Sequence, residues 1–180
     1  MGNTFFIRGF GSEIDYRGRI VPAVEKPTFA IAVLMQRRPA QSRWAESVWE
    51  LHGVLADPGG ETRLLREEGL NAQWLHPGFK LVLHKDELEG YYMNVSAPEP
   101  RVFVLWRVEG RSEGDFALPC EVTVSSDEAA RWLDGGHFVD GAAIPPEIYA
   151  WVGDYVEKNY RPEPQKRIKP RSFQHPKYRT

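Results

Sequence analysis

The chain has 180 residues, of which 42% are hydrophobic and 27% are charged, so its composition is that of an ordinary globular protein. These values exclude a wholly disordered chain, a collagen-like fibre and a coiled coil, and the length suits one domain with its own core. The formal net charge is only −2, which gives no support to a general nucleic-acid binder.

The first part of the chain divides into an irregular arm and two strands. Residues 1–27 contain four glycines and two prolines without a clear hydrophobic period, which predicts an irregular N-terminal arm. The segment TFAIAVLMQRR at residues 28–38 is rich in branched apolar side chains and lies between two prolines, which predicts a central strand buried on both faces. Residues 48–56 alternate and precede the turn sequence DPGG at 57–60, so they predict a strand that enters a hairpin rather than a helix.

Six further short runs follow, each limited by turn residues, and each predicts a strand. They cover residues 63–67, 72–75, 80–84, 91–95, 101–109 and 120–124. The sequence HPG at 76–78 predicts a turn between the second and third of these runs, with His76 in the turn. Short strands in series indicate an antiparallel sheet that curls or closes, here over residues 28–124.

Two helices are predicted near the C-terminus. Ser125 and Glu128 form a capping box ahead of a helix over residues 127–134, and two glycines end it. A second helix is predicted over residues 145–160 because two prolines begin it and apolar residues recur at helical spacing. We expect its Trp151 face to pack on the sheet. The predicted fold class is therefore α+β, with a mainly antiparallel, barrel-like sheet and two C-terminal helices.

The charge distribution separates a C-terminal tail from the rest of the chain. Residues 161–180 hold seven basic residues against one acidic residue, a net charge of +6, which leaves −8 on residues 1–160. The same segment contains four prolines and few apolar residues, so we expect a basic, flexible tail. The predicted organisation is thus an arm at 1–27, a single α+β domain at 28–160 and this tail.

Cysteine content and hydropathy bear on the compartment. Cys120 is the only cysteine, so no intrachain disulfide can form, and its position at the start of a strand predicts a partly buried thiol rather than a nucleophile. The longest apolar run, residues 29–35, is far shorter than the roughly 18 residues that a membrane-spanning helix needs. The N-terminus carries no apolar core of a signal peptide. We expect a cytoplasmic protein that does not enter a membrane.

No motif in the sequence specifies a reaction. The glycine spacings do not match a phosphate-binding loop, the histidines are too scattered for a zinc motif, and adjacent acids in turns are typical of a solvated surface. We therefore predict no catalytic residue, no metal ligand and no cofactor.

One local cluster is a candidate binding site. Arg37, Arg38 and Arg43 lie close in sequence to Trp44 and Trp49, and guanidinium groups near indoles can bind an anion or dock an acidic segment of a partner. The alternative, which we favour, is that the arginines cap the end of the sheet and lay their stems over the indoles while the charged heads stay in water.

The same segment carries a family resemblance. VLMQRRPAQSRWAESVWE at residues 33–50 resembles a bacterial family of uncharacterised proteins with a strand ending in R-R-P, then a Trp, then a second Trp in the next strand. The likeness extends over roughly residues 28–165, including AARWLDGG and IPPEIYAWVGDYVEKNY. Members of that family are often encoded beside subunits or maturation factors of molybdenum-dependent formate dehydrogenase. Some carry the label of a molybdopterin-guanine dinucleotide biosynthesis protein.

The resemblance implies a non-enzymatic accessory or assembly protein that binds a formate dehydrogenase component. The alternative is a small enzyme of molybdenum-cofactor biosynthesis. A guanylyltransferase of that pathway needs a double-glycine loop with an Arg-Met-Gly step, a downstream lysine and a magnesium-binding aspartate on a parallel sheet, and the sequence does not show them in that order. A third possibility, a basic-tailed nucleic-acid binder, is disfavoured by the acidic body. We therefore expect a protein partner.

Overall fold

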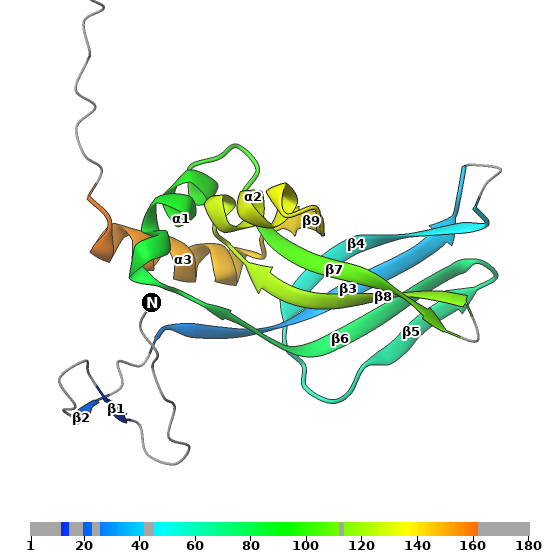
Figure 1. The fold of residues 1–180 in the computed structure, drawn as a ribbon, viewed down its shortest axis with the longest axis horizontal. Helices are drawn as coiled ribbons and strands as arrows, with labels where there is room; N and C mark the ends of the chain where they lie inside the picture. The colour runs from blue at the N-terminus through cyan, green and yellow to red at the C-terminus, as the bar shows by residue number, and fades with distance from the viewer. Residues whose placement is uncertain (1–11, 15–19, 23–25, 42–44, 112–113, 162–180) are drawn as a thin grey trace, which may run out of the picture.

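The fold is α+β, as predicted, and consists of antiparallel sheets with helices gathered at one end (Figure 1). The structure is a computed structural model, and it describes residues 12–14, 20–22, 26–41, 45–111 and 114–161. Its two larger sheets pack face to face but do not close into a barrel, so the barrel-like prediction is wrong.

The larger sheet has four strands in the order β4-β3-β6-β5, and all neighbours are antiparallel. The strands are β3 (Thr28–Pro39), β4 (Ser47–Ala56), β5 (Arg63–Glu68) and β6 (Asn71–Val82). Three consecutive residues of β3, Ile31, Ala32 and Val33, are fully buried. The strand is central, as predicted, and the face that carries Ile31, Val33 and Met35 is buried. Because successive side chains point to opposite faces, Ala32 lies on the other face, where Ala30 is exposed and Leu34 is only partly buried, so burial on both faces is limited to the middle of the strand.

The smaller sheet has three strands in the order β8-β7-β9, namely β7 (Arg101–Arg111), β8 (Gly114–Thr123) and β9 (Phe138–Ala143). The sequence did not predict β9, since its residues FVDGAA include glycine and alanine, which are rare in strands. These residues nevertheless form a strand because they pair with β7. A Cβ on Gly141 of β9 would lie 2.9 Å from the Arg101 side chain of β7, so glycine permits the close approach.

The helices differ from the prediction in number. The described residues form a 3-10 turn η1 (Lys85–Glu87) and three α-helices, α1 (Leu88–Val95), α2 (Ser126–Asp134) and α3 (Pro146–Asn159). Residues 91–95, predicted as a strand, belong to α1. Tyr91 and Asn94 are both buried and share one helical face. Gly90 lets α1 approach α2, because a Cβ there would lie 2.2 Å from the Ser125 hydroxyl oxygen.

The two predicted C-terminal helices are confirmed. The Ser125 hydroxyl accepts a hydrogen bond from the Glu128 backbone N–H at 3.1 Å, which caps the N-terminus of α2. Helix α3 begins at Pro146, and its Trp151 ring lies 5.4 Å from the ring of Phe29 on β3. The helix therefore packs its Trp151 face on the larger sheet, as expected.

Two predicted turns have other roles. Strand β6 runs without interruption through residues 76–78, because Gly78, at φ 91°, absorbs an irregularity in the ladder. His76 is therefore buried in a strand, not placed in a turn. The DPGG segment joins opposite edges of the larger sheet instead of forming a hairpin. The Asp57 carboxylate accepts backbone N–H groups of Gly59 at 2.8 Å and Gly78 at 3.1 Å, which pins this crossing loop to β6.

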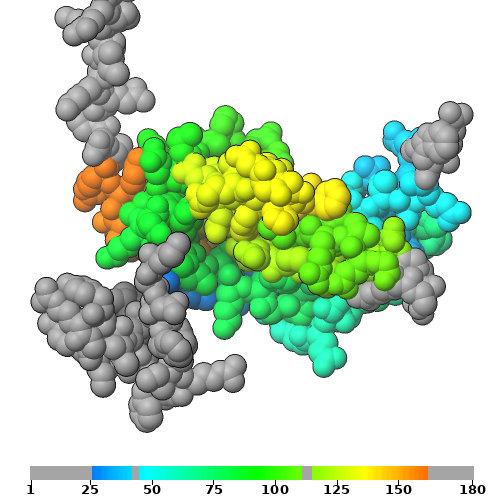
Figure 2. Space-filling view, viewed as in Figure 1, coloured from blue at the N-terminus to red at the C-terminus, as the bar shows by residue number. Residues whose placement is uncertain are grey.

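The core consists of two clusters of buried residues, one at each part of the molecule's length. At the helical end, α1 and α3 pack on buried residues from both sheets, including Leu81 of β6 and Val102 of β7. Farther along, buried side chains from the two sheets meet each other directly. Rings on β4 and β6 surround Phe116 of β8 there, so the sheets are joined by side-chain packing where a barrel would need backbone hydrogen bonds. In the space-filling view, the tips of β4, β7 and β8 form the end opposite the helices (Figure 2).

The arm predicted as irregular contains one pair of short strands, β1 (Ser12–Ile14) and β2 (Ile20–Pro22), in antiparallel register. The rest of that arm up to residue 25, and residues 162–180 of the predicted tail, lie outside the described residues. Among the described helices, none has the length and apolar character that crossing a membrane requires.

Candidate functional site

The arginines of the R-R-P segment lie on opposite faces of the larger sheet. Arg37 is paired in register with Trp49, whose ring packs on Phe116 between the sheets, so Arg37 belongs to the inner face. Arg38 is the next residue of the same strand and therefore lies on the outer face. The alternation of a strand thus splits the cluster that the sequence brings together.

Arg37 is held by the larger sheet itself. Its guanidinium carbon lies 6.0 Å from the centre of the Trp49 ring. One guanidinium nitrogen is 3.2 Å from the Glu67 carboxylate, and Nε donates to the Leu70 carbonyl oxygen at 3.3 Å. The side chain is 24% exposed. Arg37 therefore fastens the turn between β5 and β6 to the centre of the sheet.

Trp49 also has a structural position. Its indole N–H donates to the Asp115 carbonyl oxygen of β8 at 3.0 Å, and its ring meets Phe116 edge to face at 5.3 Å. These contacts link the two sheets. Arg43 and Trp44, the other two members of the predicted cluster, lie outside the described residues.

Arg38 is the member of the cluster that faces solvent on the outer face. Its Nε lies 2.8 Å from the Glu50 carboxylate, and the two side chains are 42% and 39% exposed. Exposed pairs of this kind add little to stability, so both groups can exchange their partner for another at small cost.

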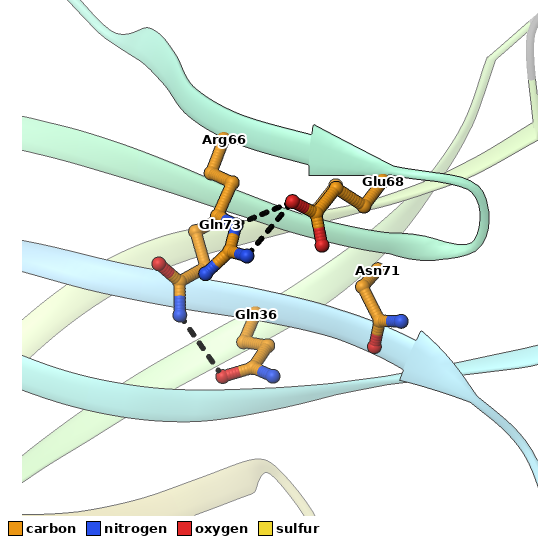
Figure 3. Close-up of a pocket in the computed structure, with 6 residues that line it drawn as sticks. Gln36, Arg66, Glu68, Asn71 and Gln73 are labelled. Carbon is orange, nitrogen blue, oxygen red and sulfur yellow. Dashed lines mark hydrogen bonds and ion pairs between the residues drawn. The ribbon is translucent and has the colours of Figure 1, made fainter.

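A row of polar side chains crosses the outer face beside Arg38. Glu50 of β4, Gln36 of β3, Gln73 of β6 and Arg66 of β5 occupy the same register across all four strands. The two glutamines share a hydrogen bond of 3.4 Å. Figure 3 shows these amides on one side of the sheet, together with Arg66 and the carboxylate of Glu68, which are 2.8 Å apart.

Three members of this row, Gln36, Gln73 and Arg66, line a shallow groove of about 210 Å³. We call the surface formed by the row, the groove and Arg38 the polar face, and its residues are Gln36, Arg38, Glu50, Arg66, Glu68, Asn71 and Gln73. The amides offer both donors and acceptors, and the flanking ion pairs offer both signs of charge. The polar face is suited to hydrogen bonding with a polar surface or peptide backbone.

The sequence reasoning missed most of the polar face. Gln36 and Gln73 stand in apolar strands, and a single glutamine in a strand has no motif around it. The sequence did contain one indication of this surface. Side chains of a strand alternate between its two faces, so Gln36 and Arg38 share a face of β3. Their grouping with Gln73 and Arg66 depends on strand order and register, which the sequence does not state.

Two further grooves lie elsewhere. One of about 310 Å³ is lined in part by Cys120, His84, Lys80 and Glu128. Burial raises the pKa of the Cys120 thiol above its ordinary value, although Arg107 acts in the opposite direction, and the thiol contacts the Leu118 carbonyl oxygen at 3.4 Å. A raised pKa reduces the thiolate fraction that a nucleophile requires. The geometry agrees with a partly buried structural cysteine.

The other groove, of about 620 Å³, lies between the loop that precedes β7 and the start of α3. It is lined mainly by apolar and proline residues, with Tyr149 at one side. The Tyr149 hydroxyl donates to the Val95 carbonyl oxygen at 3.3 Å and so ties α3 to the end of α1. In the part of the chain that the structure describes, no three histidine, cysteine, aspartate or glutamate side chains gather in a way that could hold a metal ion.

Comparisons with known proteins identify a family. A family model described as "Protein of unknown function (DUF3305)" matches residues 30–169, well over half of the chain. No curated protein and no solved structure matches the chain. The family description names neither an activity nor a partner. The match covers the three α-helices and, apart from the first two residues of β3, the two larger sheets, and the chain belongs to the DUF3305 family.

Proposed function

We propose that this protein is a non-enzymatic accessory or assembly protein that binds another polypeptide through the polar face. The observation that carries the proposal is the row of four hydrogen-bonding side chains in one register across four strands, with the groove beside it. Strand pairing joins all four residues directly and so holds the row in place. Binding through it therefore costs little ordering of the interface.

The hydrogen-bonding capacity of the polar face supports this role. Gln36 and Gln73 bond to each other once, and each amide can make further hydrogen bonds. The Asn71 side chain makes no hydrogen bond within the described residues, and it lines the groove. Because these groups are already exposed to water, a partner that supplies donors and acceptors in the same geometry replaces water without burying an unsatisfied group.

Charged side chains at the two sides of the polar face make a second contribution to binding. Arg38 and Glu50 lie at the β4 side of the polar face, and Arg66 and Glu68 lie at the β5 side. Charged pairs at the edge of an interface act chiefly on orientation and association rate. The central amides would then govern dissociation.

The identity of the partner rests on the sequence resemblance. It points to a component of a molybdenum-dependent formate dehydrogenase system, and we adopt that component as the proposed partner. The alternative of a small enzyme of molybdenum-cofactor biosynthesis makes a different prediction, namely saturable conversion of GTP or a pterin substrate.

An affinity pull-down from the native cell at near-physiological salt tests both the identity of the partner and the surface that binds it. We expect dehydrogenase polypeptides to be recovered with the parental chain and to be lost with the double variant Gln36→Ala, Gln73→Ala. The control is Arg107→Ala, since Arg107 lies on β7 of the other sheet, where it pairs with Glu109. Recovery of a different protein that still depends on the two glutamines would overturn the formate dehydrogenase assignment alone. Undiminished recovery with the double variant would overturn the polar face as the binding surface.

A further inference from the structure

The edges of the two larger sheets are protected unequally. An edge strand presents backbone N–H and C=O groups that its own sheet does not pair, and proteins usually cover or blunt such edges. The edges here are β4 and β5 of the larger sheet and β8 and β9 of the smaller one. Strand β4 is covered by β9, where the Asp140 carboxylate accepts the Leu51 backbone N–H at 3.4 Å and the Trp106 indole N–H at 3.0 Å.

Strand β8 is blunted in two ways. Its Asp115 carbonyl oxygen is occupied by the Trp49 indole N–H, and Pro119 in the middle of the strand has no N–H to offer. The rings of Trp74 and His76 on β6 also pack against Phe116 of β8. An incoming strand would have to displace these side chains.

Strand β5 has no such cover among the residues that the structure describes. It pairs only with β6, and all six of its residues are exposed. Two of them are leucines, Leu64 and Leu65, with exposed fractions of 40% and 50%. Exposed apolar side chains on an open strand edge indicate a surface that is covered in an assembly.

The charge order of β5 indicates what covers it. The strand reads RLLREE, so its basic residues, Arg63 and Arg66, precede its acidic residues, Glu67 and Glu68. When two copies of one strand pair antiparallel about a two-fold axis, the first residue of each copy meets the last residue of the other. The two ends of such a strand, here Arg63 and Glu68, then meet with opposite charge.

We propose that the free edge of β5 pairs antiparallel with β5 of a second copy of this chain, joining the two four-stranded sheets into one continuous sheet. In this register Arg63 of each copy faces Glu68 of the other, and Leu64 faces Glu67. Leu65 lies beside the two-fold axis, opposite Arg66, at the point where the β5–β6 ladder has an irregularity between Leu64 and Arg66. The contact is short, so the dimer is weak and depends on concentration. Glu68 belongs to both surfaces, but the amides of Gln36 and Gln73 lie on the surface of the sheet and remain open. This proposal does not rest on the proposed function.

Sedimentation velocity on the full chain tests the dimer. The measurement runs from about 10 µM to about 1 mM protein at low salt, with reductant present so that Cys120 cannot form an intermolecular disulfide. We expect a monomer–dimer equilibrium. Arg63→Glu and Glu68→Arg should each weaken the dimer about tenfold, because each places like charges opposite each other twice. The double variant, Arg63→Glu with Glu68→Arg, should restore the parental dissociation constant.

The control is Arg107→Glu, which reverses an exposed charge on the other sheet and should leave the dissociation constant unchanged. Circular dichroism verifies that each variant is folded. A chain that stays monomeric up to about 1 mM contradicts the proposal. So does a dimer that either single reversal leaves intact, or one that the double variant fails to restore.

Discussion

The helical end and the polar face both contain polar side chains, but they use their hydrogen bonds differently. At the helical end, Asn94 is 3% exposed and makes three hydrogen bonds, to the Arg101 carbonyl and N–H groups and to the Val124 carbonyl, at 2.7 to 2.9 Å. On the polar face, the Asn71 side chain is exposed and makes no hydrogen bond to any described residue. The first arrangement stabilises the fold, and the second leaves capacity for a partner.

A network at the helical end, with Ser125 buried at its centre, extends this contrast. The Ser125 hydroxyl donates to Glu87 at 2.6 Å while it accepts the Glu128 N–H, and Glu87 also pairs with Arg131. This network fixes η1 and α1 against α2. Substitutions at the helical end should therefore reduce stability, whereas substitutions on the polar face should reduce binding and leave stability almost unchanged.

The largest expected effect is at the contact between α1 and α2. Gly90→Ala should lower the free energy of unfolding by about 3 to 4 kcal/mol, because the new Cβ overlaps the Ser125 hydroxyl and presses on the backbone of Asp127. Urea denaturation measures the change. Gly153→Ala on α3 is the matched control, since a Cβ there meets nothing within 4 Å, and it should be neutral or slightly stabilising. Equal effects at the two glycines would contradict the packing described.

Removing the buried amide should have the next largest effect. Asn94→Ala leaves the Arg101 N–H and two backbone carbonyls without their partner, and we expect a loss of about 3 kcal/mol. Asn71→Ala removes the same side chain from the polar face and should change stability by less than about 0.5 kcal/mol. Chemical denaturation of the two variants under identical conditions compares them directly. A loss of stability at Asn71 as large as that at Asn94 would remove the distinction between the two regions.

The helical end should also respond to high pH. Burial raises the pKa of Tyr91 to about 12, against an ordinary value of 10.0. The unfolded chain then loses its proton first, so the stabilisation is complete below pH 10 and declines as the pH rises toward 12. We expect a decline on the order of 2 kcal/mol. Unfolding experiments across this range should show a flatter profile for Tyr91→Phe, and an unchanged profile would mean that other groups cause the decline.

Substitution of the two adjacent arginines should change stability less than the substitutions above, and the two changes should differ. Arg37→Ala should cost about 1 kcal/mol, because it removes the contacts with Glu67, Leu70 and Trp49. It should also increase amide hydrogen exchange in the turn between β5 and β6. Arg38→Ala loses one exposed ion pair and should cost less than about 0.5 kcal/mol. If Arg38→Ala destabilises the protein more than Arg37→Ala, the assignment of the two residues to opposite faces is wrong.

Local signals in the sequence were enough for several elements. The apolar run of β3, the cap at Ser125 and the helical spacing before Asn159 each predict their element, and the structure has all three. The failures have one cause in common, which is that tertiary contacts decide the local conformation. Tyr91 and Tyr92 suggest a strand by propensity, but they belong to α1, where their rings pack on Tyr155 of α3 and on Tyr160 at its end.

The candidate site was predictable only in part. The sequence draws attention to Arg37 and Arg38 because they are adjacent, yet the sheet separates them and joins Arg38 to Glu50. The amides of Gln36 and Gln73 lie far apart in sequence and meet through the pairing of β3 with β6. A register between strands depends on many side chains at once, so no local pattern could indicate this pairing.

The most direct test of the polar face is site-specific photocrosslinking in the native cell. A photoreactive phenylalanine analogue replaces Val48, an exposed residue of β4 paired with Arg38, in one variant and Arg107, on the other sheet, in a second variant. We expect a crosslinked polypeptide from position 48 and none from position 107, with the position-48 crosslink reduced when Gln36→Ala and Gln73→Ala are added. Crosslinks of equal yield from both positions, or from position 107 alone, would contradict the assignment of the polar face as the binding surface.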